Sequence, residues 1–162
     1  ADARMDEICR RIAREVEIAF PDSRIEITRA GDMAGCWDAQ RVSQALSNLM
    51  SNAIKYGAAD TPVRITLDGT GATEVVVRVH NEGAQIPPDT LESLFQPLVR
   101  GHAGDPTGTS LGLGLFVVRE IASAHGGSVD VESSTSSTTF SFRLPRSAGT
   151  TRATAIRRMR RT

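Results

Sequence analysis

One stretch, residues 38–56, constrains the fold more than any other part of the chain. On a helical wheel of about 100° per residue, the side chains of Val42, Leu46, Leu49 and Ala53 fall within one narrow sector. A helix with a single apolar face is stable in a globular protein only when that face packs on another layer. The stretch therefore predicts a layered fold, with a helix that starts after the N-cap residue Asp38 and ends near Tyr56, before Gly57.

The opposite stripe of this helix is polar and rich in short amides. It holds Arg41, Gln44, Asn48, Asn52 and Lys55, and Lys55 is the only lysine among 19 basic residues. Asn costs several tenths of a kcal/mol relative to Ala inside a helix. A carboxamide oxygen can ligate Mg²⁺, and an ammonium can neutralise a phosphate. The stripe is either an ordinary solvated face or a site for a metal-bound phosphate.

The rest of the chain supplies a sheet for this helix to cover. Apolar alternation and turn residues predict strands at residues 24–28, 63–67, 74–80, 128–133 and 138–145. Helical spacing predicts further helices at residues 2–20, 89–95 and 114–125, with loops at 81–88 and 99–112, the latter glycine-rich and mobile. This order predicts an α+β fold, a two-layer sandwich with helices on one face of a mixed, mostly antiparallel sheet.

Length and charge divide the chain in two. We expect one domain at residues 1–146 and a basic flexible tail at 147–162. Residues 1–145 hold 13 basic and 19 acidic side chains, a net charge of 13 − 19 = −6, whereas the last 17 residues hold six arginines and no acid. The negative body disfavours a broad nucleic-acid surface, although the tail itself has the composition to touch an acidic surface, a membrane or nucleic acid.

The sequence also bears on where the protein works. No run of about 18 apolar residues is present, so we expect no membrane contact by this domain. Cys9 and Cys36 fit no metal-ligand spacing, and reduced thiols predict a cytoplasmic protein.

Two further segments are suited to a nucleotide. SLGLGLFVV (110–118) places Gly112 and Gly114 at the opening of a helix, where free backbone N–H groups attract a phosphate. HNEGAQIPP follows a strand, and the amide of Asn81 matches the donor and acceptor edge of a purine. Gly83 permits close approach of a flat base, and Ile86 can pack on its face. Neither segment is a Walker A loop or a GxGxxG fingerprint, which disfavours those nucleotide folds.

These segments occur in an order that resembles the catalytic and ATP-binding domain of bacterial sensor histidine kinases, a member of the Bergerat-fold group with gyrase, Hsp90 and MutL. QALSNLMSNAIKYG (44–57) resembles the N box and VRVHNEGAQIPP (77–88) the G1 box. LESLFQPLVRG (91–101) resembles the F box and GTSLGLGLFVV (108–118) the G2 box. The resemblance covers about residues 5–146.

The resemblance implies ATP and Mg²⁺ as cofactors and assigns the catalytic roles. Asn52 would be the metal ligand, Asn48 would support the phosphate site, and Lys55 would contact the phosphates. The remaining residues of the implied nucleotide site are Tyr56, Asn81, Gly83, Ile86, Arg100, Thr109, Ser110, Leu111, Gly112, Leu113, Gly114 and Leu115.

The chain departs from the family pattern at Asn81, where the family has Asp, at Gln85, where it has the second G1 glycine, and at Ser110. We expect the uncharged amide of Asn81 to weaken nucleotide binding by about 1 kcal/mol. Members that hydrolyse ATP have Glu at the position of Asn48, and an amide cannot act as a general base. This residue favours phosphoryl transfer to a neutral imidazole over hydrolysis.

The resulting prediction is a protein-histidine kinase domain in a two-component system, which transfers the γ-phosphoryl group of Mg-ATP to a histidine outside this chain. Its partners would be the dimerisation and histidine-phosphotransfer domain of a parent kinase and a response regulator. His80, His102 and His125 do not follow the phosphoacceptor pattern. Two alternatives remain: a nucleotide-binding regulatory module without transfer activity, and an anti-sigma-type serine kinase.

Overall fold

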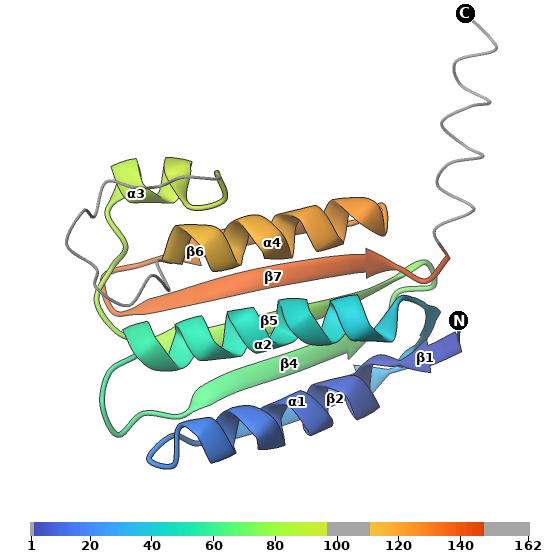
Figure 1. Ribbon diagram of the computed structural model, residues 1–162, viewed down its shortest axis with the longest axis horizontal. Helices are drawn as coiled ribbons and strands as arrows, with labels where there is room; N and C mark the ends of the chain where they lie inside the picture. The colour runs from blue at the N-terminus through green and yellow to red at the C-terminus, as the bar shows by residue number, and fades with distance from the viewer. Residues whose placement is uncertain (1, 97–110, 148–162) are drawn as a thin grey trace, which may run out of the picture.

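The computed structural model describes residues 2–96 and 111–147, and it contains two layers (Figure 1). Three helices lie side by side on one face of a sheet: α1 (Met5–Ala19), α2 (Ala39–Tyr56) and α4 (Leu111–Ala124). A shorter helix, α3 (Pro88–Ser93), lies beyond α4 at one end of the helical layer. This arrangement confirms the predicted α+β sandwich.

The main sheet has five strands in the order β2-β4-β5-β7-β6. Their bounds are β2 (Ile25–Gly31), β4 (Val63–Gly69), β5 (Glu74–Glu82), β6 (Ser128–Ser133) and β7 (Ser137–Pro145). Strands β2 and β4 are parallel and every other neighbouring pair is antiparallel, so the sheet is mixed, as expected. Two short strands, β1 (Asp2–Arg4) and β3 (Ala34–Cys36), form a separate antiparallel pair.

The core lies between the two layers. All four residues of the apolar sector of α2 are buried, and they belong to the same core as the buried positions of β4 and β5. Alternate residues of these strands point to the helices because side chains alternate across a strand; they are Val63, Ile65 and Leu67 on β4 and Val75, Val77 and Val79 on β5. Burial of each of these aliphatic side chains stabilises the fold by roughly 1.5–3 kcal/mol relative to exposure to water.

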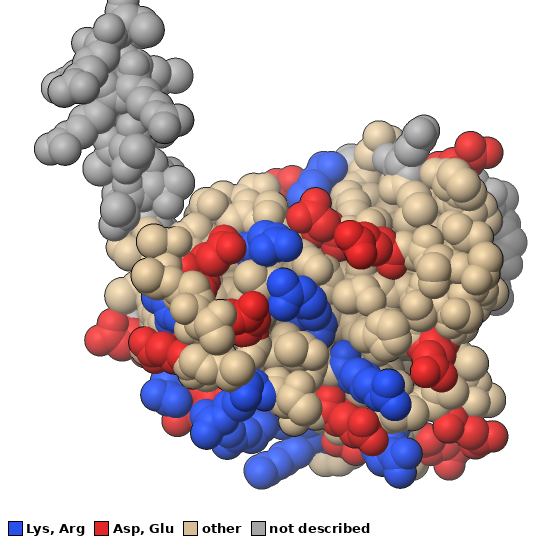
Figure 2. Space-filling model, turned by 180° about the vertical axis from the view of Figure 1, so that it is seen from behind, with Lys and Arg blue, Asp and Glu red and all other residues tan. Residues whose placement is uncertain are grey.

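The other face of the sheet carries paired charges. Figure 2 shows acidic and basic side chains interspersed on the side turned away from the helices. Glu26 lies opposite Arg64 in the register of β2 and β4, with 3.7 Å between Glu26 Oε2 and Arg64 Nε. Arg78 Nη1 lies 3.6 Å from Asp68 Oδ2. These pairs keep the uncovered face polar, as a face in contact with water requires.

Several predicted boundaries were wrong. The first helix begins at Met5 rather than residue 2, because residues 2–4 pair with β3. Strand β5 runs through Asn81 and Glu82, the first two residues of the predicted loop 81–88, since these residues pair with Thr138 and Ser137 of β7. Helix α4 begins at Leu111, three residues earlier than expected. Most of the predicted mobile loop, residues 99–110, lies outside the described residues.

Candidate nucleotide-binding site

Helix α2 is fixed at its start. The Asp38 side chain accepts hydrogen bonds from the backbone N–H groups of Gln40 and Arg41, at 3.1 and 3.2 Å, as an N-cap does. The backbone N–H of Asp38 donates in turn to Nε2 of the buried His125, at 3.1 Å. His125 follows the last residue of α4, so the start of α2 is anchored to the end of α4 and the register between the two helices is set.

The polar stripe of α2 meets the first turns of α4. Asn48 Nδ2 donates a hydrogen bond to the backbone oxygen of Gly114, at 3.2 Å. A Cβ atom built on Gly114 would lie 3.8 Å from Asn52 Nδ2 and 3.9 Å from Asn48 Cβ. Segments 66 residues apart in the chain are therefore brought together, Asn48 and Asn52 on one side and the glycine-rich helix start on the other.

The Asn52 amide is the most unusual polar group of this region. Its residue is only 9% exposed, and Nδ2 is buried with no hydrogen-bond partner in the described part of the chain. A buried polar group left unpaired costs about 1–3 kcal/mol. A phosphate oxygen would accept from this nitrogen, and the amide oxygen is a ligand that Mg²⁺ accepts. The side chain therefore suits a metal-bound phosphate better than it suits the protein alone.

The start of α4 offers backbone N–H groups to the same place. Residues 111–114 form its first turn, where N–H groups have no partner within the helix. Leu115 is fully buried in the core and is the fifth residue of the helix, so neither its side chain nor its backbone N–H is among the groups that the first turn leaves for a ligand. Three further predicted site residues lie outside the described residues: Arg100, Thr109 and Ser110.

The end of β5 forms a second cluster beneath the last turn of α2. Asn81 is 5% exposed. A Cβ atom on Gly83 would lie 2.7 Å from the backbone oxygen of Tyr56 and 3.5 Å from Asn81 Nδ2, so only glycine fits there. Gly57 borders the same cluster, because a Cβ there would lie 3.6 Å from Asn81 Cβ. The predicted base-binding residues thus meet the predicted phosphate-binding helix at its C-terminal end.

Three more predicted site residues lie around these clusters and differ in how exposed they are: Lys55, Tyr56 and Ile86. Lys55 is exposed and Tyr56 is 48% exposed, so both side chains are accessible to a ligand. Ile86 is partly buried against the core. Because Asn52 and Tyr56 lie one turn apart on α2, about 6 Å along its axis, one helix places both clusters.

Sequence reasoning missed the residues that hold the loop after β5. The hydroxyl of Ser133 accepts a hydrogen bond from the backbone N–H of Ile86, at 2.9 Å, and lies 2.8 Å from Thr138 Oγ1. The loop after β5, which contains Gly83 and Ile86, is attached through these hydroxyls to the hairpin of β6 and β7. Ser and Thr at the ends of strands are too common to have indicated this role.

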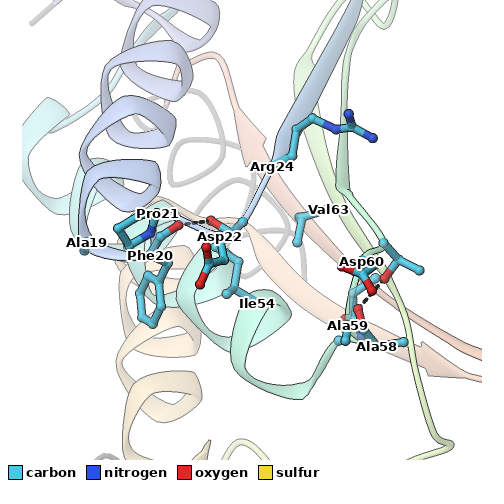
Figure 3. A pocket seen from close by; sticks show the side chains of 14 residues that line it. Ala19, Phe20, Pro21, Asp22, Arg24, Ile54, Ala58, Ala59, Asp60 and Val63 are labelled. Carbon is cyan, nitrogen blue, oxygen red and sulfur yellow. Dashed lines mark hydrogen bonds between the residues drawn. The ribbon is translucent and has the colours of Figure 1, made fainter.

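A cavity of about 310 Å³ opens beside this region, between the C-terminal ends of α1 and α2 (Figure 3). Phe20, Ile54 and Val63 contribute apolar walls, and Asp22 and Asp60 contribute carboxylates. It shares only Asn81 with the predicted site residues. The sequence did not indicate it, because its lining comes from three separate segments and β5.

Comparison with known proteins supports the family that the sequence resembles. A family model described as histidine kinase-, DNA gyrase B-, and HSP90-like ATPase matches residues 37–148. The chain is 34% identical to a bacteriophytochrome of Pseudomonas aeruginosa over 145 residues, which is 89% of this chain and 20% of that protein. It is 34% identical to the sensor protein VanSC of Enterococcus gallinarum over 112 residues, which is 68% of this chain and 30% of that protein.

Solved structures are also similar. The catalytic domain of histidine kinase ThkA superimposes with a TM-score of 0.79 at 27% identity, covering 92% of this chain and 97% of that one. The chain spans between 20% and 30% of the length of the two curated relatives above. Within residues 2–96 and 111–147, no helix has the length and apolar character needed to cross a membrane. The chain belongs to the histidine kinase-, DNA gyrase B- and HSP90-like ATPase family, as an ATP-binding domain of the histidine-kinase type.

Proposed function

We propose that this domain binds ATP together with Mg²⁺ at the junction of α2, α4 and the end of β5, and transfers the γ-phosphoryl group to a histidine of a dimerisation domain. The observation that carries the proposal is the meeting of Asn48 and Asn52 with the first turns of α4 through Gly114. Phosphoryl transfer depends mainly on positioning and on neutralising charge, and this junction supplies groups for both.

Each residue has a distinct role in this proposal. Asn52 holds Mg²⁺ through its amide oxygen and donates from Nδ2 to a phosphate oxygen. Asn48 is bonded to the Gly114 carbonyl and positions the N–H groups of α4 toward the phosphates. Lys55 places a compact positive charge near the same phosphates. Asn81 reads the base, with Gly83 and Tyr56 beside it. Arg100, Thr109 and Ser110 stay sequence-based assignments to the site.

Two of the three histidines are engaged in the fold, which supports an acceptor outside this chain. His125 is buried, with Nδ1 2.8 Å from the backbone oxygen of Ile121 and Nε2 bonded to the N–H of Asp38. His80 Nδ1 lies 2.8 Å from Thr139 Oγ1. Its neighbours on β5, Val79 and Asn81, point to the helical layer, so His80 points to the opposite face. Neither ring faces the proposed phosphate site.

The binding step is tested by calorimetric titration of ATP with and without Mg²⁺. We expect Mg²⁺ to strengthen ATP binding to the wild type, and Asn52→Ala to weaken Mg-ATP binding about tenfold or more, because a metal ligand and a phosphate donor are both lost. Asn52→Asp restores a metal ligand but not the donor. Gln44→Ala, an exposed position on the same stripe, is the control and should bind as the wild type does. Equal affinity of wild type and Asn52→Ala would refute the assigned site.

The transfer step is tested with γ-labelled ATP and the dimerisation domain of the parent kinase. Label should appear on that domain with the wild type and be lost with Asn52→Ala, and it should pass onward to a response regulator. Tight ATP binding without transfer to the dimerisation domain would identify a regulatory nucleotide-binding module instead. Acid-stable label on serine of a partner would identify a serine kinase.

A further inference from the structure

The Asn81 side chain is buried, but no strong hydrogen bond in the described part of the chain fixes which way its amide group is turned. Asn81 is the last residue of β5 that faces the helical layer, and it is 5% exposed. Its Nδ2 lies 3.5 Å from the backbone oxygen of Glu82, at the outer limit of a hydrogen bond. In the described part of the chain, its Oδ1 has no hydrogen-bond partner. Turning the amide by 180° would exchange the nitrogen and the oxygen and sacrifice only this long contact.

The surroundings of Asn81 leave room beside the amide. Asn81 forms part of the wall of the cavity of about 310 Å³ at the C-terminal ends of α1 and α2. Gly57 and Gly83 present only backbone to it, and a Cβ on Gly83 would lie 3.5 Å from Asn81 Nδ2. A flat group can approach an amide that is flanked by backbone on both sides, whereas side chains at these two positions would cover it.

The chemistry of an amide differs from that of a carboxylate in one respect that matters here. The Watson–Crick edge of adenine presents a donor at N6 beside an acceptor at N1. A 6-oxopurine such as hypoxanthine presents the reverse, an acceptor at O6 beside a donor at N1. An amide holds an oxygen acceptor next to an NH₂ donor, so each of its two orientations matches one of these edges. An ionised carboxylate has acceptors only, so with either base it accepts one hydrogen bond and faces the second group, N1 of adenine or O6 of the 6-oxopurine, with a repulsive oxygen.

We propose that Asn81 determines base selectivity, and that the site accepts 6-oxopurine nucleoside triphosphates nearly as well as ATP. This proposal rests on the proposed nucleotide site, and it concerns which purine that site admits. The amide turns to suit the base, and neither orientation gives up a strong bond within the described part of the protein. Removing the amide, as in Asn81→Ala, would remove the contacts to both bases.

The test is calorimetric titration of the full chain with Mg-ATP and with Mg-ITP, whose base is hypoxanthine. For the wild type, we expect the two dissociation constants to agree within about fivefold. For Asn81→Ala, we expect both nucleotides to bind at least about tenfold more weakly than they bind the wild type, since a matched pair of base contacts is worth roughly that factor or more. Gln85→Ala removes an amide at an exposed position nearby, and it should keep both wild-type affinities.

Each outcome decides a different point. Tight ATP binding with ITP more than tenfold weaker in the wild type would overturn the proposal on selectivity and leave the nucleotide site intact. Unchanged affinities for both nucleotides in Asn81→Ala would show that Asn81 does not read the base. Failure of both nucleotides to bind the wild type would instead refute the proposed function. Should Asn81→Ala not fold, Asn81→Leu keeps a side chain of similar shape without its polar atoms, and it should weaken the binding of both nucleotides in the same way.

Discussion

At the scale of single residues, Gly114 lacks a side chain, and we expect this to matter for nucleotide binding rather than for folding. A Cβ at this position would lie 3.8 Å from Asn52 Nδ2 and 3.9 Å from Asn48, which are ordinary contact distances. Ala is favoured over Gly inside a helix by up to about 1 kcal/mol. The added methyl group would nevertheless occupy the space in front of both amides, where we place the phosphates.

Gly114→Ala should therefore separate stability from binding. We expect its melting temperature without nucleotide to equal or exceed that of the wild type, while its affinity for Mg-ATP falls by about tenfold or more because the phosphates meet the methyl group. Calorimetry and thermal melting of the same preparation measure both quantities. An unchanged affinity would place the phosphates elsewhere.

Gly83→Ala provides the contrast, because its Cβ would lie 2.7 Å from the backbone oxygen of Tyr56. That distance is too short for any side chain, and the backbone has to shift. This variant should lose stability, by about 1–3 kcal/mol, along with affinity. The two glycines are thus distinguished by what a methyl group would meet, which the sequence does not reveal.

At the scale of elements, Asp6 joins three segments near the beginning of the domain. Its carboxylate, 4% exposed, lies 3.4 Å from Arg4 Nε of β1 and 3.3 Å from Arg10 Nη2 of α1, and it pairs with Arg29 of β2. Burial raises the pKa of this carboxyl, but the attraction of Arg4 and Arg29 and the hydrogen bonds to it outweigh burial and leave the pKa below its ordinary value. Asp6 is therefore ionised in the folded protein at neutral pH.

A lowered pKa in the folded state gives a stability that is fully present above the unfolded pKa, about 4, and is lost as the pH falls through the folded pKa. Asp6→Asn should therefore lower the free energy of unfolding by about 2 kcal/mol at neutral pH, because the three arginines lose a buried partner. The difference from wild type should narrow only below about pH 4. Urea denaturation of both proteins from neutral pH down to about pH 3 measures this difference in the free energy of unfolding.

Asp22→Asn is the matched control, since Asp22 is exposed and forms no ion pair in the described part of the chain. Its free energy of unfolding should stay close to that of the wild type. A difference between wild type and Asp6→Asn that stays constant down to pH 3 would mean that the Asp6 charge is not what stabilises this junction.

At the scale of the whole molecule, Arg146 closes the described domain. Its guanidinium donates hydrogen bonds to the backbone oxygens of Ala34, Gly69 and Gly71, at 2.6, 2.8 and 2.9 Å. Its backbone N–H donates to Thr73 O, at 2.8 Å. The end of β7 is thereby tied to β3 and to the turn between β4 and β5.

These contacts of Arg146 make the predicted domain boundary, at residue 146, testable. A chain that ends at residue 147 should melt within about 2 °C of the full chain and bind Mg-ATP equally well. A chain that ends at residue 145 should melt about 4–8 °C lower, because losing about 2 kcal/mol shifts the melting temperature by that much in a domain of this size. Arg146→Ala in the full chain should reproduce most of the loss. Lower stability of the chain ending at 147 would assign a structural role to the basic tail.

Local sequence determined those features that depend on residues close in the chain. The apolar sector of α2, its N-cap Asp38 and the alternation in β4 and β5 were all predicted, because helix and strand periods act within a few residues. The order of these elements was sufficient for the α+β sandwich. The N, G1 and G2 boxes were sufficient for the family, and Asn48 and Asn52 stood out because asparagine is costly in a helix.

Only the tertiary structure decided which of these residues meet. The bond from Asn48 to Gly114, the position of Asn52 beside the same glycine and the position of Asn81 beside Gly57 each bring together segments far apart in the sequence. That the buried Asn52 Nδ2 has no partner within the described residues was likewise visible only in the structure. The extension of β5 through Asn81 and the start of α1 at Met5 were likewise set by pairing with distant strands. Local propensity is a short-range energy, whereas strand pairing, burial and hydrogen-bond satisfaction depend on which surfaces the whole chain brings together.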